Sequence, residues 1–353
     1  MPLRTQPGDT DLYLPLPEEG EMLDPYTVHT YYLGCSVPDA RIGAYIYLRA
    51  QPAFRLAQGG AVIFRGLENT AVLDAEHHDY RATMPWPEVD GNVIRVANGL
   101  TITVRTPGEL IRVQYSSPDG ATGFDLEQRA ITPLVARGHI VPGEEDHHAG
   151  ARREPGGIEQ FMHCTGTLTL RGERHDVDCL SVRDRSWLQV RREDPGGARR
   201  TPPVGWTPIS FGDELSLNVT SIENRETNPA WLGLYDVPDG APTHYSGWIS
   251  RSGETRGVSR VRRNVLEYHP LQHAALRQEL EVEDETGETY RFTGEAIAMS
   301  AMHSWPNIAF HDSVYRWTDE RGRVTHCTYQ EIWYDDYQRA MTARALTSLR
   351  QAV

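Results

Sequence analysis

The sequence predicts an all-β protein made of two antiparallel β-barrel domains packed together, with a short C-terminal helix. Three observations support this fold class. Short segments with alternating apolar and polar residues recur along the chain, 31 glycines and 23 prolines supply frequent turns, and long stretches with a period of 3.6 residues are missing. Alternation with a period of two is typical of antiparallel strands that bury one face.

The predicted strands follow one another along most of the chain. Turn sequences separate several of them, namely Asn98-Gly99, Asp119-Gly120, Asp239-Gly240 and Thr286-Gly287. The one helical segment is 336–352, where Met341, Leu346 and Leu349 form a modest apolar stripe. The expected strands are 27–37, 42–50, 60–65, 92–97, 100–105, 110–116, 161–170, 175–187, 208–211, 215–223, 243–250, 274–283, 290–300, 313–317 and 324–334.

A stretch rich in glycine, proline and charge separates two series of strands at 138–157. We therefore expect an N-terminal β-domain over residues 1–150 and a C-terminal β-domain over residues 151–353. Closing each series into a barrel would remove the exposed edges that make sheets aggregate.

Composition and charge exclude several classes of function. The net charge of −14 argues against a nucleic-acid partner, because phosphate backbones require clustered cations. The chain contains no lysine, so Schiff-base chemistry, pyridoxal phosphate linkage and a phosphate-binding P-loop are excluded. Four scattered cysteines predict reduced thiols, and no apolar run is long enough to span a membrane. We expect a cytoplasmic protein, because residues 1–20 lack a signal pattern.

The most distinctive segment is 158–188, which reads as two alternating strands around Arg171-Gly172-Glu173-Arg174. With Leu170 opposite His175, Phe161 pairs with Asp184 and Glu159 with Ser186. Alternation places one set of side chains on a common face, and the sequence leaves open which face points inward. This set comprises Glu159, Phe161, His163, Val182 and Asp184.

Asp184 has two interpretations. A partly desolvated carboxyl group has a raised pKa and can protonate an alkene or a departing hydroxyl group. An aspartate between two arginines near Trp187 can equally form a structural ion pair at a strand end.

These residues also carry a resemblance to a known family. The second half of the chain resembles the carotenoid 1,2-hydratase (hydroxyneurosporene synthase) superfamily, and it is most similar to an uncharacterised bacterial branch of it. The strand Tyr329-Gln330-Glu331-Ile332-Trp333 resembles the closing strand of that branch, and residues 29–37 resemble the first domain more faintly. The motif residues are Gln160, Gly166, Thr167, Gly172, Asp178, Arg183, Asp184, Arg185, Ser186 and Trp187.

The resemblance implies two lipocalin-like β-domains with a ligand pocket within or between them. It also implies protonation chemistry for the aspartate and the aromatic residue of the motif, which correspond to Asp184 and Trp187. The sequence departs from the motif at Leu188, where a glycine is usual, and at His163, where many relatives carry other residues. A shared fold does not guarantee shared chemistry, so these departures leave the substrate open.

Further candidates lie in the second half of the chain. Trp305 is a candidate lid over an apolar ligand, although a plain structural loop is also possible. Tyr315, Trp317 and Glu331 could line a pocket or belong to a barrel core in which an arginine satisfies the glutamate. The 14 histidines include two adjacent pairs but no spacing typical of a metal site, so we expect no metal.

We therefore expect an acid–base enzyme without cofactors that hydrates, dehydrates, isomerises or cyclises a hydrophobic isoprenoid, polyene or polycyclic molecule. Asp184 is the expected proton donor, and His163 or Glu159 the base. Trp187, Phe161, Trp305, Tyr315, Trp317 and Glu331 are the expected substrate-binding residues. The alternatives are a binding protein for lipids or hydrophobic metabolites, and an enzyme that only shapes its substrate. A homodimer is a possible assembly.

Overall fold

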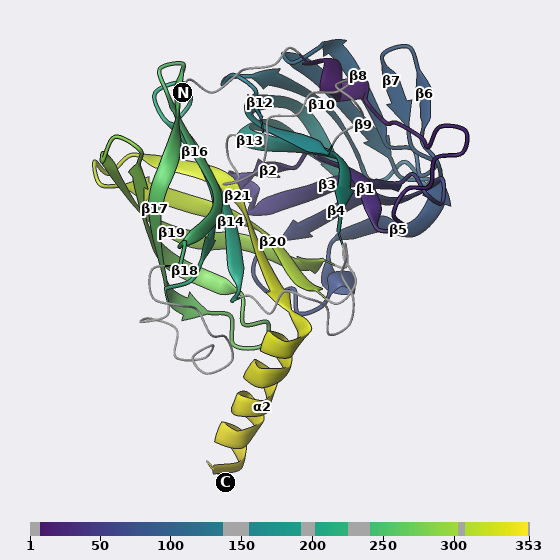
Figure 1. Cartoon of the computed structure of the whole chain (residues 1–353). Helices are drawn as coiled ribbons and strands as arrows, with labels where there is room; N and C mark the ends of the chain where they lie inside the picture. Colours follow the sequence, from purple (N-terminus) through teal and green to yellow (C-terminus); the bar gives the residue numbers. More distant parts are fainter. Residues whose placement is uncertain (1–7, 137–154, 192–201, 225–240, 303–307, 352–353) are drawn as a thin grey trace.

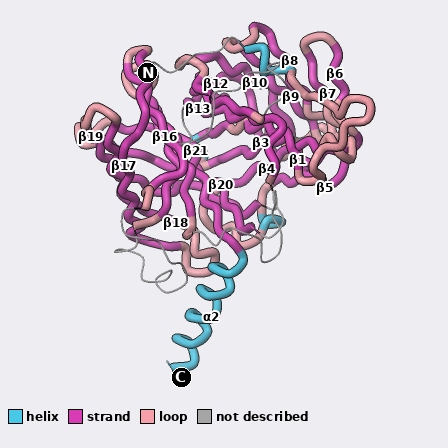
Figure 2. The backbone as a smooth tube through the Cα atoms, viewed as in Figure 1, coloured by secondary structure: helices cyan, strands magenta, loops and turns pink. Residues whose placement is uncertain are grey.

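The computed structural model describes residues 8–136, 155–191, 202–224, 241–302 and 308–351. Strands dominate the described chain (Figure 2). They form two β-units that lie side by side, an N-terminal half-barrel and a C-terminal closed barrel (Figure 1). The prediction of an all-β protein with a C-terminal helix is confirmed.

The half-barrel is one antiparallel sheet of thirteen strands. Its order is β5-β4-β3-β1-β13-β12-β10-β9-β8-β7-β6, with β2 paired to β3 and β11 paired to β12, and the path does not close on itself. Its strands are β1 (Thr27–Tyr32), β2 (Cys35–Val37), β3 (Ile42–Gln51), β4 (Leu56–Arg65), β5 (His77–Pro85), β6 (Glu88–Asp90), β7 (Val93–Arg95), β8 (Thr101–Thr106), β9 (Leu110–Ser116), β10 (Gly123–Ala130), β11 (Val135–Ala136), β12 (Gly156–Leu170) and β13 (Glu173–Val190).

The closed barrel has eight strands in sequence order, and β14 pairs with β21 to complete the ring. The helix α2 (Asp335–Gln351) follows directly and projects away from the body (Figure 1). The barrel strands are β14 (Val204–Ser210), β15 (Ser216–Ile222), β16 (His244–Arg251), β17 (Glu254–Tyr268), β18 (Ala275–Asp284), β19 (Thr289–Met302), β20 (Ile308–Asp319) and β21 (Val324–Tyr334). Three short 3-10 helices, η1 (Gly8–Leu12), η2 (Pro38–Ala40) and η3 (Val72–Asp74), complete the described elements.

The long hairpin β12–β13 forms as predicted, but its register differs from the prediction by two residues. Leu170 pairs with Glu173, and Glu159 pairs with Asp184 rather than Ser186. The physical reason is the turn, because Arg171 (φ 50°) and Gly172 (φ 85°) both adopt left-handed conformations and make a two-residue loop. A shift of two residues keeps every side chain on its predicted face.

Both strands of this hairpin belong to the half-barrel, because β13 pairs with β1 and β12 pairs with β10. The first barrel strand is β14, so the chain passes from the half-barrel to the barrel between Val190 and Val204. The expected boundary segment 138–157 lies mostly outside the described residues. The division into units of 1–150 and 151–353 therefore stays a prediction.

The two units pack outer wall against outer wall. The half-barrel contributes Tyr32, Tyr45, Tyr47, Val62, Phe64, Phe161 and Val182 to this interface, and the barrel contributes Trp206, Trp248, Ala298, Met302, Phe310 and Val314. Each unit also has its own core of buried apolar residues inside its curved sheet. The interface core therefore lies between two complete β-layers.

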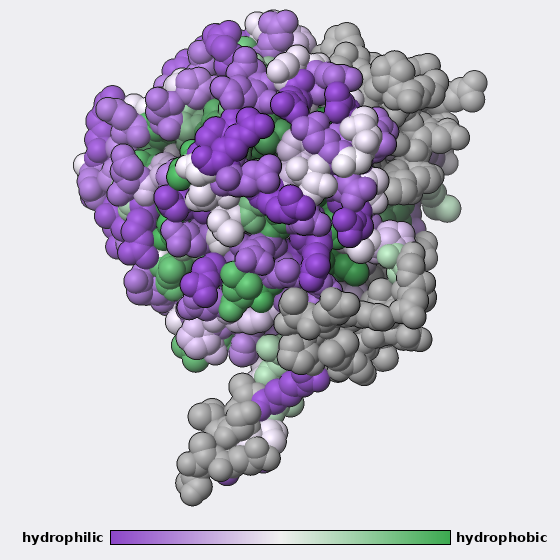
Figure 3. Space-filling view, turned by 90° about the vertical axis from the view of Figure 1, so that its left-hand side faces the viewer, coloured by the Kyte–Doolittle hydropathy of each residue, from purple (hydrophilic) through white to green (hydrophobic). Residues whose placement is uncertain are grey.

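On the face drawn in Figure 3, the coloured surface is mainly hydrophilic, and apolar residues show only in small separated groups. Among the described residues, no helix has both the length and the apolar character that crossing a bilayer requires.

Candidate functional site

A row of four polar residues crosses the half-barrel on the face that meets the barrel. Glu159 on β12 pairs with Asp184 on β13, Asp184 with Tyr32 on β1, and Tyr32 with Tyr47 on β3. Directly opposed residues in antiparallel strands share a face and lie within about 5.5 Å of one another. Two carboxyl groups and two phenols therefore stand side by side along the interface.

Glu159 is buried, with 6% of its surface exposed, and three N–H groups of the barrel hold its carboxylate. The indole Nε1 of Trp206 donates to Oε1 at 3.2 Å. The indole Nε1 of Trp248 (2.6 Å) and the Nδ2 of Asn218 (2.8 Å) donate to Oε2. Burial and the negative charge of Asp184 raise the pKa of Glu159, while the three donors oppose this change.

Asp184 is half-buried and borders a cluster of aromatic rings. Tyr45 lies at the centre of the cluster, 5.6 Å from Tyr32, 5.3 Å from Tyr47 and 6.2 Å from Tyr80 between ring centroids. Burial raises the pKa values of Tyr32 and Tyr47, so both phenols stay protonated at neutral pH. The carboxyl pair therefore adjoins a wall of buried tyrosines.

A third buried carboxyl group, Asp312 on β20, lies on the barrel side of the same interface. It accepts hydrogen bonds from Gln330 Nε2 (2.9 Å), Thr328 Oγ1 (3.2 Å) and the Tyr32 hydroxyl group (3.4 Å). Burial raises the pKa of Asp312 to about 7. Sequence reasoning missed this residue, although the alternation Phe310, Asp312, Val314 places it on one face of a strand.

Phe161 belongs to this interface, but His163 lies away from the carboxyl pair. The Phe161 ring is fully buried against Trp248, with 5.6 Å between centroids. His163 pairs in register with Leu180, roughly 13 Å along β13 from Asp184. Its Nε2 lies 2.6 Å from the exposed carboxylate of Asp178, as in a surface ion pair. The structure thus brings Glu159, Asp184 and Phe161 together and does not bring His163 to them.

The two arginines that flank Asp184 point to the opposite face of β13, into the half-barrel. Arg183 forms a buried ion pair with Asp11, with 2.5 Å between Nη1 and Oδ1. Arg185 donates to the carbonyl oxygen of Tyr13 and lies 4.0 Å from the centroid of Tyr31. The arginines therefore hold the N-terminal segment 10–15 against the half-barrel, whereas Asp184 faces the other way.

Trp187 is also on the opposite face from Asp184. Its ring covers Gly156, where a Cβ atom would lie 2.4 Å from it, and it packs with Leu134, Ile158 and Leu188. Leu188, which replaces the expected glycine, still has a left-handed φ of 54°. Trp187 is therefore part of the packing on this face of β13, and its expected role in substrate binding stays a prediction.

The remaining candidates lie elsewhere. Tyr315, Trp317 and Glu331 point into the closed barrel, where Arg263 Nη2 forms an ion pair with Glu331 Oε1 at 2.6 Å. Trp305 lies outside the described residues. The described candidates are therefore spread over the interface, the exposed surface, the opposite face of β13 and the barrel interior.

No cluster of three or more histidine, cysteine, aspartate or glutamate side chains suits a metal ion within the described ranges. The expectation of a reaction without metal or organic cofactor stays a prediction.

A comparison with known protein families assigns the chain to a family. A family described as a domain of unknown function (DUF7064) matches residues 21–333, which span both β-units. The chain belongs to the DUF7064 family. The carboxyl row, Asp312 and the barrel interior all lie within the matched DUF7064 region. The sequence has no significant match among curated proteins.

Among solved structures, the chain is similar to kievitone hydratase from Nectria haematococca, with 12% sequence identity and a TM-score of 0.47. The similarity covers 96% of this chain and 98% of that chain.

Proposed function

We propose that this DUF7064 protein is an acid–base enzyme that hydrates, dehydrates, isomerises or cyclises a hydrophobic small molecule at the interface of its two β-units. The observation that carries this proposal is the opposed pair of Glu159 and Asp184 beside the tyrosine wall. The resemblance of the segment around Asp184 to carotenoid 1,2-hydratases supports an isoprenoid, polyene or polycyclic substrate.

The contacts of Glu159 support different roles for the two carboxyl groups. Adjacent carboxyl groups resist double ionisation, so the pair retains a proton over a wider pH range than a single carboxyl group would. All three hydrogen bonds to Glu159 come from N–H donors, which an ionised carboxylate accepts best. Because these donors enclose Glu159, we assign transfer of the shared proton to the half-buried Asp184.

In hydration, Asp184 transfers this proton to one carbon of an alkene, and a carbocation forms at the other. The electron-rich faces of Tyr47 and the neighbouring rings stabilise that positive charge. Water adds to the cation and returns one proton to the Asp184 carboxylate, which restores the enzyme and yields an alcohol. Dehydration is the reverse, and loss of a different proton gives an isomer.

The test can be run before the substrate is identified. The purified protein is incubated in deuterium oxide with an organic-solvent extract of the organism that carries the gene, and the extract is analysed by mass spectrometry. We expect deuterium to enter carbon positions of an apolar metabolite with the natural protein and not with Asp184→Asn. Asp178→Asn, on the same strand but exposed, is the matched control and should retain exchange.

A second candidate is binding without turnover, and the saturated contacts of Glu159 favour it, because a fully satisfied carboxylate can be purely structural. Native mass spectrometry of the purified protein distinguishes the two. A retained apolar molecule that gains no deuterium, with or without Asp184, would identify a binding protein and contradict the enzyme.

A further inference from the structure

Three of the four cysteines meet inside the half-barrel, although they lie far apart in the sequence. Cys164 on β12 and Cys179 on β13 are directly opposed in the long hairpin. Cys35 begins β2, and the backbone N–H group of the next residue, Ser36, donates to Cys179 Sγ at 3.4 Å. All three cysteines are free thiols in the apolar core of this unit. Folding therefore assembles a cluster of thiols.

The opposed pair has the backbone geometry that a disulfide requires. Directly opposed residues of antiparallel strands have Cα atoms about 4.5–5.5 Å apart. This lies within the range of roughly 4.4–6.8 Å that disulfides span. The side chains of Cys164 and Cys179 lie on the same face of the hairpin, and their thiols share a hydrogen bond. A bond between the two sulfur atoms therefore needs little movement of the backbone.

Cys35 is the competing partner in the cluster. Its thiol also forms a hydrogen bond with that of Cys164. However, Cys35 lies on a strand of only three residues, whereas Cys164 and Cys179 lie in an unbroken ladder between residues 156–170 and 173–187. The ladder keeps the opposed pair in register, so the structure favours a bond between these two residues.

The surroundings of the pair set the order of reaction. Cys179 is 7% exposed and Cys164 is fully buried, so a small oxidant reaches Cys179 first. The N–H group of Ser36 stabilises negative charge on the Cys179 sulfur. The hydrogen bond with Cys164 and burial nevertheless raise the pKa of Cys179 well above its ordinary value. Oxidation should therefore be slow at neutral pH and become faster as the pH rises.

We propose that Cys164 and Cys179 are a modification site, where hydrogen peroxide converts the two thiols into a reversible disulfide. Peroxide transfers one oxygen atom to the Cys179 sulfur, which becomes a sulfenic acid, and one water leaves. The Cys164 sulfur then attacks that sulfur. The S–S bond forms as the S–O bond breaks, and the oxygen leaves with the thiol proton as a second water. The pair loses two electrons, the peroxide gains them, and the site does not depend on the proposed catalytic function.

Peptide mapping of the full-length, folded protein tests the site. The protein is treated with hydrogen peroxide, its remaining thiols are alkylated, and it is digested with trypsin without reduction. Arginines 153, 171, 174 and 183 place Cys164 and Cys179 in separate peptides, 154–171 and 175–183. We expect these two peptides to appear linked, with the loss of two hydrogen atoms, and to separate after treatment with dithiothreitol. Absence of a link, or a main link through Cys35, would overturn the proposal.

Serine variants separate the pair from the other thiols. Cys35→Ser and Cys327→Ser should keep the link, because Cys35 is the competing partner and Cys327 lies in the core of the other β-unit. Cys164→Ser should abolish the link and leave Cys179 to oxidise further, to the sulfinic acid. Circular dichroism checks that each variant is folded. Loss of the link in folded Cys35→Ser would contradict direct attack by Cys164.

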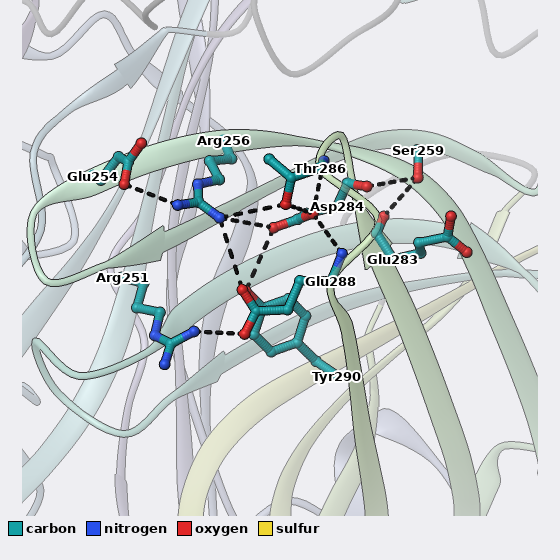
Figure 4. Close-up of polar contacts among 9 residues, drawn as sticks. All are labelled: Arg251, Glu254, Arg256, Ser259, Glu283, Asp284, Thr286, Glu288 and Tyr290. Carbon is teal, nitrogen blue, oxygen red and sulfur yellow. Dashed lines mark hydrogen bonds and ion pairs between the residues drawn. The ribbon is translucent and has the colours of Figure 1, made fainter.

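Hydrogen exchange locates the effect of the link within the protein. A cross-link between opposed strands should slow amide exchange along β12 and β13 about tenfold. The β18–β19 hairpin is the internal reference, because contacts of Arg256 and Thr286 with Asp284 order its turn and it contains no cysteine (Figure 4). Unchanged exchange in β12 and β13, or equal slowing in both hairpins, would contradict a cross-link at this site.

Discussion

Glu159 and Asp184 occupy directly opposed positions on β12 and β13, and side chains of the barrel donate hydrogen bonds to Glu159. One carboxyl group is fixed by three N–H donors, and the other keeps part of its surface exposed. Glu159 is therefore a structural link between the β-units, and the half-buried Asp184 beside it is the proton donor that we propose.

Replacing Glu159 by glutamine should destabilise the protein by about 1–3 kcal/mol, because an amide NH2 group must face at least one of the three donors. Denaturant unfolding at neutral pH measures the change. Glu127→Gln, on the exposed side of β10, is the control and should change stability by less than about 0.5 kcal/mol. Equal stability of Glu159→Gln and the natural protein would contradict the link.

Asp312 should make folding less favourable as pH rises. The pKa of Asp312 is raised from 3.8 to about 7 in the folded protein. The preference of the folded state for the protonated carboxyl group therefore contributes its full stabilisation below pH 3.8. That contribution is lost between about pH 4 and pH 7. Asp312→Asn should therefore gain stability relative to the natural protein at pH 8, by at most about 4 kcal/mol, and gain least at pH 4. Unfolding free energies at both pH values check this, and a gain that is the same at both would contradict the assignment.

His311 should act in the opposite direction. Burial, aided by His269 and His273, lowers the pKa of His311 from 6.5 to about 3. The neutral ring therefore supports folding above pH 6.5, and this support is lost as pH falls toward 3. His311→Gln should flatten the acid side of the stability profile, measured as unfolding free energy at pH 7 and pH 5. The difference at pH 7 reports lost packing, and only the additional change at pH 5 reports protonation.

The buried ion pair of Asp11 and Arg183 should be costly to break. Asp11→Ala leaves the guanidinium group buried without its partner, which costs about 3–5 kcal/mol. Thermal unfolding measures the loss, and proteolysis of the N-terminal segment should become faster. Asp90→Ala breaks the exposed pair with Arg95 and should cost less than about 1 kcal/mol. Similar losses in the two variants would show that the N-terminal segment contributes little.

Leu188 occupies a backbone conformation that favours glycine, so two substitutions separate strain from packing. Leu188→Ala keeps the left-handed residue and loses the buried side chain, at a cost of about 2–5 kcal/mol. Leu188→Gly loses the same packing but relieves about 1 kcal/mol of strain. Glycine should therefore be more stable than alanine and less stable than leucine in denaturant unfolding. The reverse order of glycine and alanine would show that the backbone is unstrained.

Much of the fold could be predicted from alternation, because a strand with one buried face records its orientation in the sequence. The common face of Glu159, Phe161 and Asp184 is confirmed even though the register of the hairpin is not. The register depended on whether the turn used two or four residues, and the sequence Arg-Gly-Glu-Arg allowed both. Strand β10 was missed, although Phe124 and Leu126 alternate with polar residues along it.

The partners of the site could not be predicted in the same way. Trp206, Asn218 and Trp248 lie on three different strands and meet Glu159 only because two outer walls pack together. Periodicity within a strand shows which side is buried but not which other strand buries it. Asp312 and Tyr32 come together for the same reason, across 280 residues of sequence.

The back-to-back packing of the two β-units bears on how such a gene can change. Every donor to Glu159 among the described residues comes from the barrel, while the glutamate and Asp184 come from the half-barrel. Neither half contains this arrangement by itself, so a split gene would give fragments in which the acceptor or the donors lack their partners. Either β-unit alone would therefore expose its side of this contact, so the arrangement exists only in the joined chain.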